Sequence, residues 1–227
     1  VLGSAAGEIS PAAANRMTAR LVHDAGIEPM LKSWMVIDNH DIPRIATLLP
    51  DVAQRRWVQA LQFTLPGAPN IYYGAELGMT GGGDPENRGP MQWERLRDDN
   101  PDLQWMRQLI TLRKQHRALR VGDYRAVEAE RLIAFERHTD RALETVVVLA
   151  NPTNAPVTER VMVANPWLMD DMPMIDLLRP LTGTNALETA PRFGAGFLTV
   201  TVPPRGVLVL QPRQRELGGY DRFKRVP

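Results

Sequence analysis

Four apolar residues run directly into four polar residues in the stretch Trp34-Met35-Val36-Ile37-Asp38-Asn39-His40-Asp41. A short continuous apolar run is typical of a strand that is buried on both faces, as in a parallel sheet. Polar residues that follow such a strand directly are where a βα barrel places its chemistry. The stretch therefore predicts a buried strand with a functional loop at its carboxyl end.

Helix signals flank this strand on both sides. Predicted helices span residues 10–25, 51–65 and 100–119, and each opens at a Ser, Asp or Asn that can cap free N–H groups. Trp57 and Met106 fall on apolar helix faces at helical spacing, so we expect both side chains in the core.

A second short strand is predicted at Ile71-Tyr72-Tyr73, before a loop rich in Gly and Pro at residues 80–90. Helices that alternate with buried strands indicate βα units. A complete barrel takes roughly 250 residues, so residues 1–120 have room only for the last few units. We therefore expect an α/β region here, the incomplete C-terminal part of a (β/α)8 barrel.

The character of the chain changes after Gly122. Segments rich in strand-forming residues, separated by Asn-Pro, Thr-Gly and Pro-Pro turns, lie at 131–137, 145–149, 157–163, 197–202 and 207–210. Residues 121–212 are therefore predicted to form an all-β unit, an antiparallel β-sandwich domain. The polar tail at 213–227 carries Gly218-Gly219, and we expect it to be mobile.

Composition excludes several classes of function. The 227 residues carry a net charge of +1, so no strong field favours nucleic acid or an anionic membrane as a partner. No apolar run approaches the ~20 residues that span a bilayer. The absence of cysteine excludes disulfides, thiolate zinc sites and cysteine nucleophiles. There is no initiator Met and no signal-peptide pattern, so we expect a processed start or a piece of a longer protein, and the compartment stays open.

Three segments resemble the α-amylase family of glycoside hydrolases. The first is similar to the family's last signature region, at the end of the seventh barrel strand: Ile37-Asp38-Asn39-His40-Asp41-Ile42-Pro43-Arg44. The second is similar to the eighth strand and its loop, and spans Leu65 to Met79 and then Gly82-Gly83-Asp84-Pro85-Glu86-Asn87-Arg88 to Met91-Gln92-Trp93. The third, at 203–210, is similar to the last strand of the family's C-terminal β-domain. The order and spacing of these segments make the resemblance specific.

The resemblance implies roles for individual residues. Retaining glycosidases use a nucleophile and an acid about 5 Å apart, and the family adds a third carboxylate, which matches Asp41. Asp41 is then expected to stabilise the transition state by hydrogen-bonding sugar hydroxyls, with His40 donating to the same sugar. Asp84 and Arg88 are implied to hold the neighbouring sugar on the non-reducing side. Three further residues match positions that support the site: Arg44, Tyr73 and Glu76.

Each of these residues also has a purely structural interpretation. Asp41 can cap a loop or a helix start, as aspartate often does. His40 can be a buried structural imidazole. Asp84 and Arg88 can be a loop ion pair, alone or together with sugar contact.

Other kinds of site fit less well. The glycines at 81–83 lack both the Gly-Lys-Ser/Thr ending and the GxGxxG spacing of phosphate loops. His23-Asp24 and His40-Asp41 could suggest a metal-dependent phosphohydrolase, but no third histidine stands nearby. We therefore expect neither a metal nor a cofactor.

Two expected carboxylates are missing from the sequence. The family's nucleophile follows a Gly-x-Arg-x-Asp pattern, which does not occur. Glu8 superficially resembles the acid, but it precedes a helix cap and lies only about one βα unit from Asp41. The chain is therefore expected to be only part of an enzyme, and the resemblance implies that this enzyme is an α-glucan hydrolase that cleaves α-1,4 bonds of starch or maltodextrins.

If the chain is a piece of a longer enzyme, two further expectations follow. The isolated chain should be inactive, and it should self-associate through exposed barrel edges. The loop at 81–93 resembles cyclomaltodextrinases and neopullulanases, and parts of it resemble oligo-1,6-glucosidases and trehalose synthases. The sequence leaves open the exact linkage and whether the enzyme hydrolyses or transglycosylates. The alternative is a non-catalytic amylase-like module that binds carbohydrate or another protein.

Overall fold

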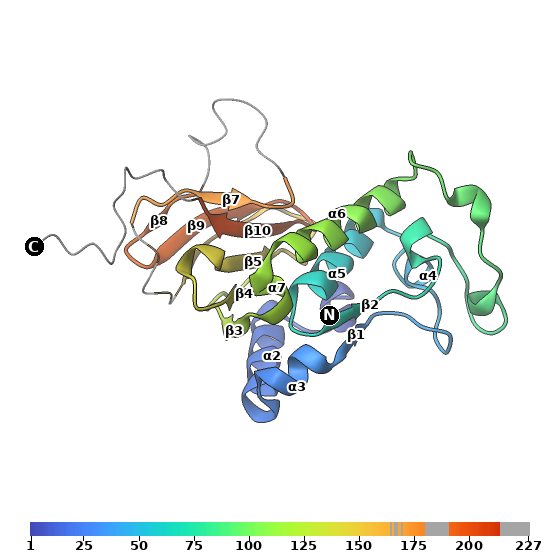
Figure 1. Cartoon of the computed structure of the whole chain (residues 1–227), viewed down its shortest axis with the longest axis horizontal. Helices are drawn as coiled ribbons and strands as arrows, with labels where there is room; N and C mark the ends of the chain where they lie inside the picture. The colour runs from blue at the N-terminus through green and yellow to red at the C-terminus, as the bar shows by residue number, and fades with distance from the viewer. Residues whose placement is uncertain (164, 166–167, 169, 180–190, 214–227) are drawn as a thin grey trace, which may run out of the picture.

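The computed structural model describes residues 1–163, 165, 168, 170–179 and 191–213. A helical N-terminal half lies beside an all-β C-terminal half (Figure 1). No helix in the described residues is long and apolar enough to cross a membrane. The predicted mobile tail lies outside the described residues, except Arg213, whose N–H donates to the carbonyl of Pro173. The α-helices are α1 (Leu2–Ala5), α2 (Pro11–Ala25), α3 (Ile27–Lys32), α4 (Ile45–Leu48), α5 (Val52–Thr64), α6 (Pro101–Gln115) and α7 (Arg117–Val121).

Helices α2, α5 and α6 begin where the sequence predicts. Each N-cap side chain accepts a hydrogen bond from a backbone N–H of the first turn: Ser10, Asp51 and Asn100. The prediction of one continuous helix from 100 to 119 is wrong. His116 takes an extended conformation, with φ −105° and ψ 105°, so it separates α6 from α7. The prediction did not include the short helices α1, α3 and α4.

Two short strands form a parallel pair in the N-terminal half. β1 (Trp34–Val36) and β2 (Ala68–Asn70) pair with Met35 opposite Pro69. The predicted strand at 71–73 is therefore wrong, and the real strand lies three residues earlier. Strand propensity favours Ile-Tyr-Tyr over Ala-Pro-Asn, but tertiary pairing overrides it. Pro69 is tolerated because β2 has a strand neighbour on one side only within the described residues.

The prediction that β1 is buried on both faces is also wrong. Trp34 is 74% exposed and Val36 is 43% exposed, and only the following Ile37 is buried, at 5%. Helix α5 covers the pair from one side, where Gln62 Nε2 donates to the carbonyls of Met35 (2.9 Å) and Asn70 (2.8 Å). No second layer covers the other face within the described residues.

The C-terminal half consists of antiparallel strands in two sheets. The strands are β3 (Asp123–Ala126), β4 (Ile133–His138), β5 (Val146–Ala150), β6 (Val157–Met162), β7 (Met174–Asp176), β8 (Phe193–Gly194), β9 (Phe197–Val202) and β10 (Val207–Pro212). One sheet has the order β3-β4-β5-β10-β7 and the other β6-β9-β8. The predicted strands are found with shifts of up to two residues at their ends, whereas β3, β7 and β8 were not predicted.

The five-stranded sheet separates two hydrophobic cores. In β5, Val146 and Val148 face the core that α5 and α6 share, which contains the predicted core residues Trp57 and Met106. Val147 points the other way, into the core between the two sheets. Since successive side chains of a strand alternate between faces, β5 is buried on both sides. The two halves of the chain therefore share one continuous packing interface.

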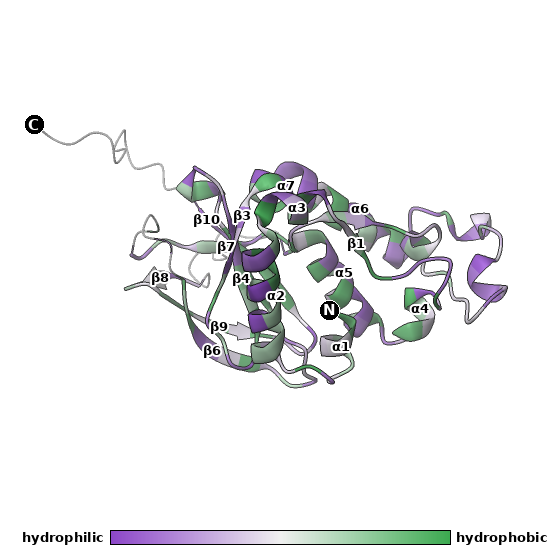
Figure 2. Cartoon of the chain, turned by 90° about the horizontal axis from the view of Figure 1, so that it is seen from below, coloured by the Kyte–Doolittle hydropathy of each residue, from purple (hydrophilic) through white to green (hydrophobic). Residues whose placement is uncertain are grey.

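Helix α2 docks on the edge of the five-stranded sheet, where it runs across β3 and β4 (Figure 2). The buried Asn15 donates from Nδ2 to the carbonyl of Leu132 and accepts from the N–H of Ala134, both over 3.0 Å. The amide thus pairs with the strand as a neighbouring strand would. A predicted barrel helix is therefore anchored to the β half.

Arginines close the C-terminal end of α5. The last carbonyls of a helix have no partner within the helix. Arg113 on α6 donates to the carbonyls of Phe63 (2.8 Å) and Gly67, and Arg137 on β4 donates to that of Thr64 (2.8 Å). Because β2 begins directly after this helix end, the same contacts help to position β2.

Candidate active site

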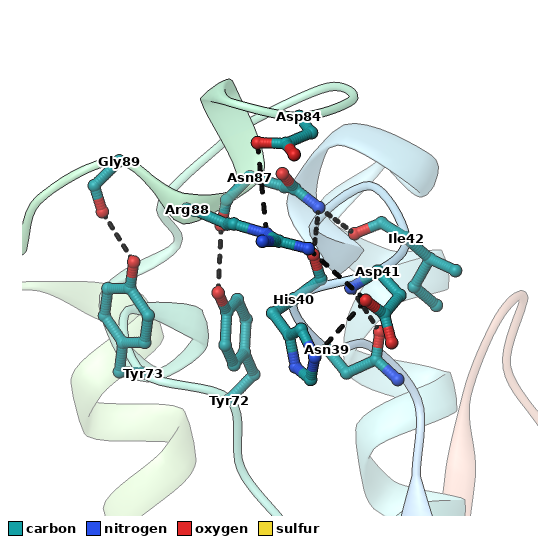
Figure 3. Close-up of polar contacts among 10 residues, drawn as sticks. All are labelled: Asn39, His40, Asp41, Ile42, Tyr72, Tyr73, Asp84, Asn87, Arg88 and Gly89. Atoms are coloured by element: carbon teal, nitrogen blue, oxygen red, sulfur yellow. Dashed lines mark hydrogen bonds and ion pairs between the residues drawn. The ribbon is translucent and has the colours of Figure 1, made fainter.

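The carboxyl ends of β1 and β2 lie at the same edge because the two strands are parallel. The loop at 37–44 follows β1, and the segment at 71–90 follows β2. Figure 3 shows that side chains from these two loops meet. The predicted site residues His40, Asp41, Asp84 and Arg88 all belong to this group.

The first loop is shaped by two side chains that precede His40. Buried Asp38 accepts a hydrogen bond from the N–H of Ile45 at the start of α4 (2.9 Å), and Asn39 Oδ1 accepts from the N–H of Asp41 (2.8 Å). Burial raises the pKa of Asp38, opposed by the hydrogen bond from Ile45 and by the charge of Arg44. The first N–H of α4 is therefore bound by Asp38 and not by Asp41.

Asp41 is the centre of a polar cluster. Its Oδ1 lies 3.2 Å from His40 Nε2 and 3.4 Å from Arg88 Nη2. Arg88 Nε lies 3.9 Å from Asp84 Oδ1, so the predicted ion pair exists, but it is long. The side chains of His40 and Asp41 are each 62% exposed, which contradicts a buried structural histidine. Ion pairs at such exposure contribute little to stability, about 0–1 kcal/mol.

Arg44 packs against the two tyrosines that follow β2. It is fully buried, and its guanidinium lies 4.7 Å from the ring centroid of Tyr72 and 4.6 Å from that of Tyr73. Its Nη1 also donates to the carbonyl of Tyr73. The tyrosine hydroxyls reach the second loop, because Tyr73 donates to the carbonyl of Gly89 (2.7 Å). Glu76, the third predicted support residue, lies close enough for its charge to raise the pKa of Asp38.

Asn87 was not among the predicted site residues. Its side-chain amide is buried and donates to backbone carbonyls on both sides of Asp41. The family-like segment includes this asparagine, but its position between Glu86 and Arg88 in a polar loop gives no sign of this contact. Its partners lie more than forty residues away in sequence.

No second carboxylate contacts Asp41 within the described residues. Glu8 lies in the turn between α1 and α2. In the same part of the chain, no three or more His, Cys, Asp or Glu side chains are grouped to hold a metal ion. The cluster can therefore bind hydroxyl groups, with carboxylates as acceptors and Arg88 as a donor.

Comparison with known proteins identifies the family. Residues 8–122, half of the chain, match the family model "Alpha amylase, catalytic domain". A cyclomaltodextrinase from Geobacillus thermopakistaniensis is 34% identical over 184 residues, which cover 78% of this chain and 28% of that protein. Neopullulanase 2 from Thermoactinomyces vulgaris is 36% identical over 108 residues, which cover 46% of this chain and 18% of that protein. The chain thus spans less than a third of either relative.

Solved structures show the same relationship. The native debranching enzyme of Nostoc punctiforme superimposes with a TM-score of 0.71 at 28% identity, covering 89% of this chain and 40% of that one. A cyclic α-maltosyl-(1→6)-maltose hydrolase from Arthrobacter globiformis, solved with maltose, gives a TM-score of 0.65 at 25% identity, covering 92% of this chain and 42% of that one. The chain therefore belongs to the α-amylase family of glycoside hydrolases.

Proposed function

We propose that this chain supplies part of the active site of a retaining α-glucan hydrolase, which cleaves α-1,4 bonds in starch or maltodextrins. The names of the relatives support the substrate class, since they include cyclomaltodextrinases, neopullulanase 2 and maltogenic amylases. In this proposal, Asp41 stabilises the transition state. The nucleophile and the proton donor come from residues outside the site described above.

The geometry of Asp41 is the observation that carries the proposal. Its Oδ1 is held by His40 and Arg88, whereas its Oδ2 makes no hydrogen bond or ion pair to a side chain within the described residues. An exposed carboxylate fixed by one oxygen can accept hydrogen bonds from sugar hydroxyls through the other. When the sugar ring distorts toward an oxocarbenium ion, such bonds favour the transition state over the ground state.

The surrounding side chains complement this carboxylate. His40 donates a hydrogen bond to the same sugar, and Asp84 with Arg88 offers an acceptor and a donor to vicinal hydroxyls of the next sugar. Arg44, Tyr73 and Glu76 support the loops from below. All four sugar-facing side chains are roughly half exposed, so they are open to a ligand.

The proposal divides the chain into two domains. We assign residues 1–120 to the C-terminal part of the catalytic (β/α)8 barrel, and residues 121–212 to a β-sandwich domain that buttresses it. The isolated chain is then inactive, because a retaining mechanism needs two further carboxylates about 5 Å apart.

The test compares the full-length protein that contains these residues with its Asp41→Asn variant, using maltoheptaose and a reducing-sugar assay. We expect hydrolysis by the unsubstituted protein. The variant should turn over at least about a hundredfold more slowly, which is on the order of the effect of losing one transition-state contact. The chain of residues 1–227 alone should show no hydrolysis.

Two results would count against the proposal. Hydrolysis by residues 1–227 alone would contradict the claim that the nucleophile and the proton donor are absent from this chain. Maltodextrin binding without hydrolysis by the full-length protein would assign a non-catalytic, carbohydrate-binding module instead.

A further inference from the structure

The side-chain amide of Asn87 brackets Asp41. Its Nδ2 donates to the carbonyl of His40 (2.9 Å) and to that of Ile42 (3.1 Å), the two residues that flank Asp41 (Figure 3). One amide group can donate two hydrogen bonds, and here both fix the backbone of the loop that carries Asp41. The position of the Asp41 carboxylate is therefore coupled to the loop that follows β2.

Asn87 itself is held by contacts with Tyr72 and with the backbone of Gly81. The backbone carbonyl of Asn87 accepts a hydrogen bond from the hydroxyl of Tyr72 (3.1 Å), and the Tyr72 ring packs on the buried Arg44. The backbone of Gly81 approaches so closely that a Cβ there would lie 2.9 Å from the Cα of Asn87. Gly81 also accepts from the N–H of Arg44 (3.0 Å) and donates to Thr47 Oγ1 (2.8 Å). The backbone around Asn87 is therefore held by Tyr72 and by the Gly81 segment.

Burial separates the role of Asn87 from that of its neighbour Arg88. Arg88 also donates to the carbonyl of His40 (3.0 Å), but it is half exposed and can reach a sugar. Asn87 is only 1% exposed, so a sugar cannot touch it. Its hydrogen bonds to the carbonyls of His40 and Ile42 are therefore the direct link between Asn87 and the loop that carries Asp41.

We propose that Asn87 is a positioning residue for glycoside cleavage, which sets the placement of Asp41 by holding the carbonyls of His40 and Ile42. This inference rests on the function proposed for Asp41. Displacing a catalytic group by about 1 Å costs on the order of 10²-fold in rate. Asn87→Asp keeps the size of the side chain but replaces the donor with an acceptor that faces two carbonyls, so it should displace the loop.

Asn151 provides a matched control. It is also buried, and its Nδ2 donates to the carbonyls of Ala155 (2.7 Å), Val202 (3.1 Å) and Pro203 (3.0 Å) in the β half. Asn151→Asp imposes the same chemical change away from Asp41. Any effect that both variants share reflects general destabilisation rather than positioning.

The experiment uses the full-length protein with Asn87→Asp, Asn87→Ala and Asn151→Asp. It measures kcat and KM for maltoheptaose, together with amide hydrogen exchange over residues 39–44. We expect the Asn87 variants to lower kcat at least tenfold with KM changed less than threefold, and to speed exchange in this segment. Asn151→Asp should leave kcat within twofold and exchange over 39–44 unchanged.

The inference is overturned if the Asn87 variants keep both kcat and the exchange pattern, if only KM rises, or if Asn151→Asp lowers kcat equally. An unsubstituted protein that hydrolyses no glucan refutes the proposed function instead. The exchange measurement then decides alone whether Asn87 holds the loop: faster exchange over 39–44 in the Asn87 variants supports the placement, and unchanged exchange refutes it. If Asn87→Asp does not fold, Asn87→Ala carries the same comparison.

Discussion

Arg137 on β4 donates a hydrogen bond from Nη1 to the carbonyl oxygen of Thr64, the last residue of α5, over 2.8 Å. The same buried guanidinium donates to the carbonyls of Gly122 (2.9 Å) and Asp123 (3.3 Å). Within the described residues it forms no ion pair, and burial lowers its pKa to about 9. One cation thus joins the helix that precedes β2 to the start of the β half.

Replacing Arg137 should destabilise the whole chain. Arg137→Met leaves the buried carbonyls of Thr64 and Gly122 without this donor, and hydrogen bonds to charged groups contribute about 1.5–3 kcal/mol each. We expect a loss of about 3 kcal/mol in the free energy of unfolding, measured by urea denaturation. Arg107→Met is the control, because Arg107 is exposed on α6 and should change stability by about 0.5 kcal/mol or less. Equal effects of the two substitutions would contradict this account.

Glu136 should make stability depend on pH. Its carboxylate is fully buried on β4, 2.6 Å from Arg125 Nη1 and 3.7 Å from His138 Nδ1. Burial raises the pKa of Glu136 in spite of the opposing charge of Arg125. The folded state therefore binds more protons than the unfolded state between the ordinary and the raised pKa. Stability should fall as pH rises through this window.

Glu136→Gln removes this titration. The difference in unfolding free energy between variant and parent should shift in favour of the variant as pH rises from the ordinary glutamate pKa to neutrality. Glu94→Gln, at an exposed position, should leave a constant difference. If the free energies of unfolding of Glu136→Gln and of the parent changed with pH in the same way, burial would not raise the pKa of Glu136.

Arg44 should not tolerate replacement by lysine. A planar guanidinium lies against both Tyr72 and Tyr73, and an ammonium cannot reproduce that stacking together with the bond to the carbonyl of Tyr73. We expect Arg44→Lys to destabilise the chain by about 2 kcal/mol, seen as a lower Tm in thermal unfolding. The exposed Arg97 supplies the control, and Arg97→Lys should leave Tm unchanged within error. A Tm for Arg44→Lys equal to that of the parent would refute the role of the stacking.

The open face of β1 should promote self-association of the isolated chain. Trp34 and Val36 are exposed on this strand, and exposed apolar strands pair readily with other chains. Light scattering should give a mass that rises with concentration, and Trp34→Glu should lower it toward the monomer value. Trp93→Glu is a matched control on the exposed loop, since Trp93 is 68% exposed but lies outside a strand. A monodisperse monomer without any substitution would rule out this expectation.

Local signals in the sequence located most of the elements. The side chains of Ser10, Asp51 and Asn100 cap helices within three residues of themselves, so the information lies close along the chain. Strand β2 was misplaced because its position depends on pairing with β1, more than thirty residues away. Strand propensity favoured residues 71–73 instead, where the side chains of Tyr72 and Tyr73 pack on Arg44 beside the site.

The sequence by itself determined the family, the starts of α2, α5 and α6, and the polar loop that carries His40 and Asp41, because the short motifs, the N-cap residues and the apolar-to-polar run are each local patterns. Only the tertiary structure decided what holds that loop. It showed that Asp38 binds the N–H of Ile45, placed Arg88 at 3.4 Å from Asp41, and brought Asn87 to the carbonyls of His40 and Ile42. The contacts of Arg88 and Asn87 join residues more than forty positions apart, and a hydrogen bond between such residues depends on how the chain packs rather than on any neighbour in the sequence.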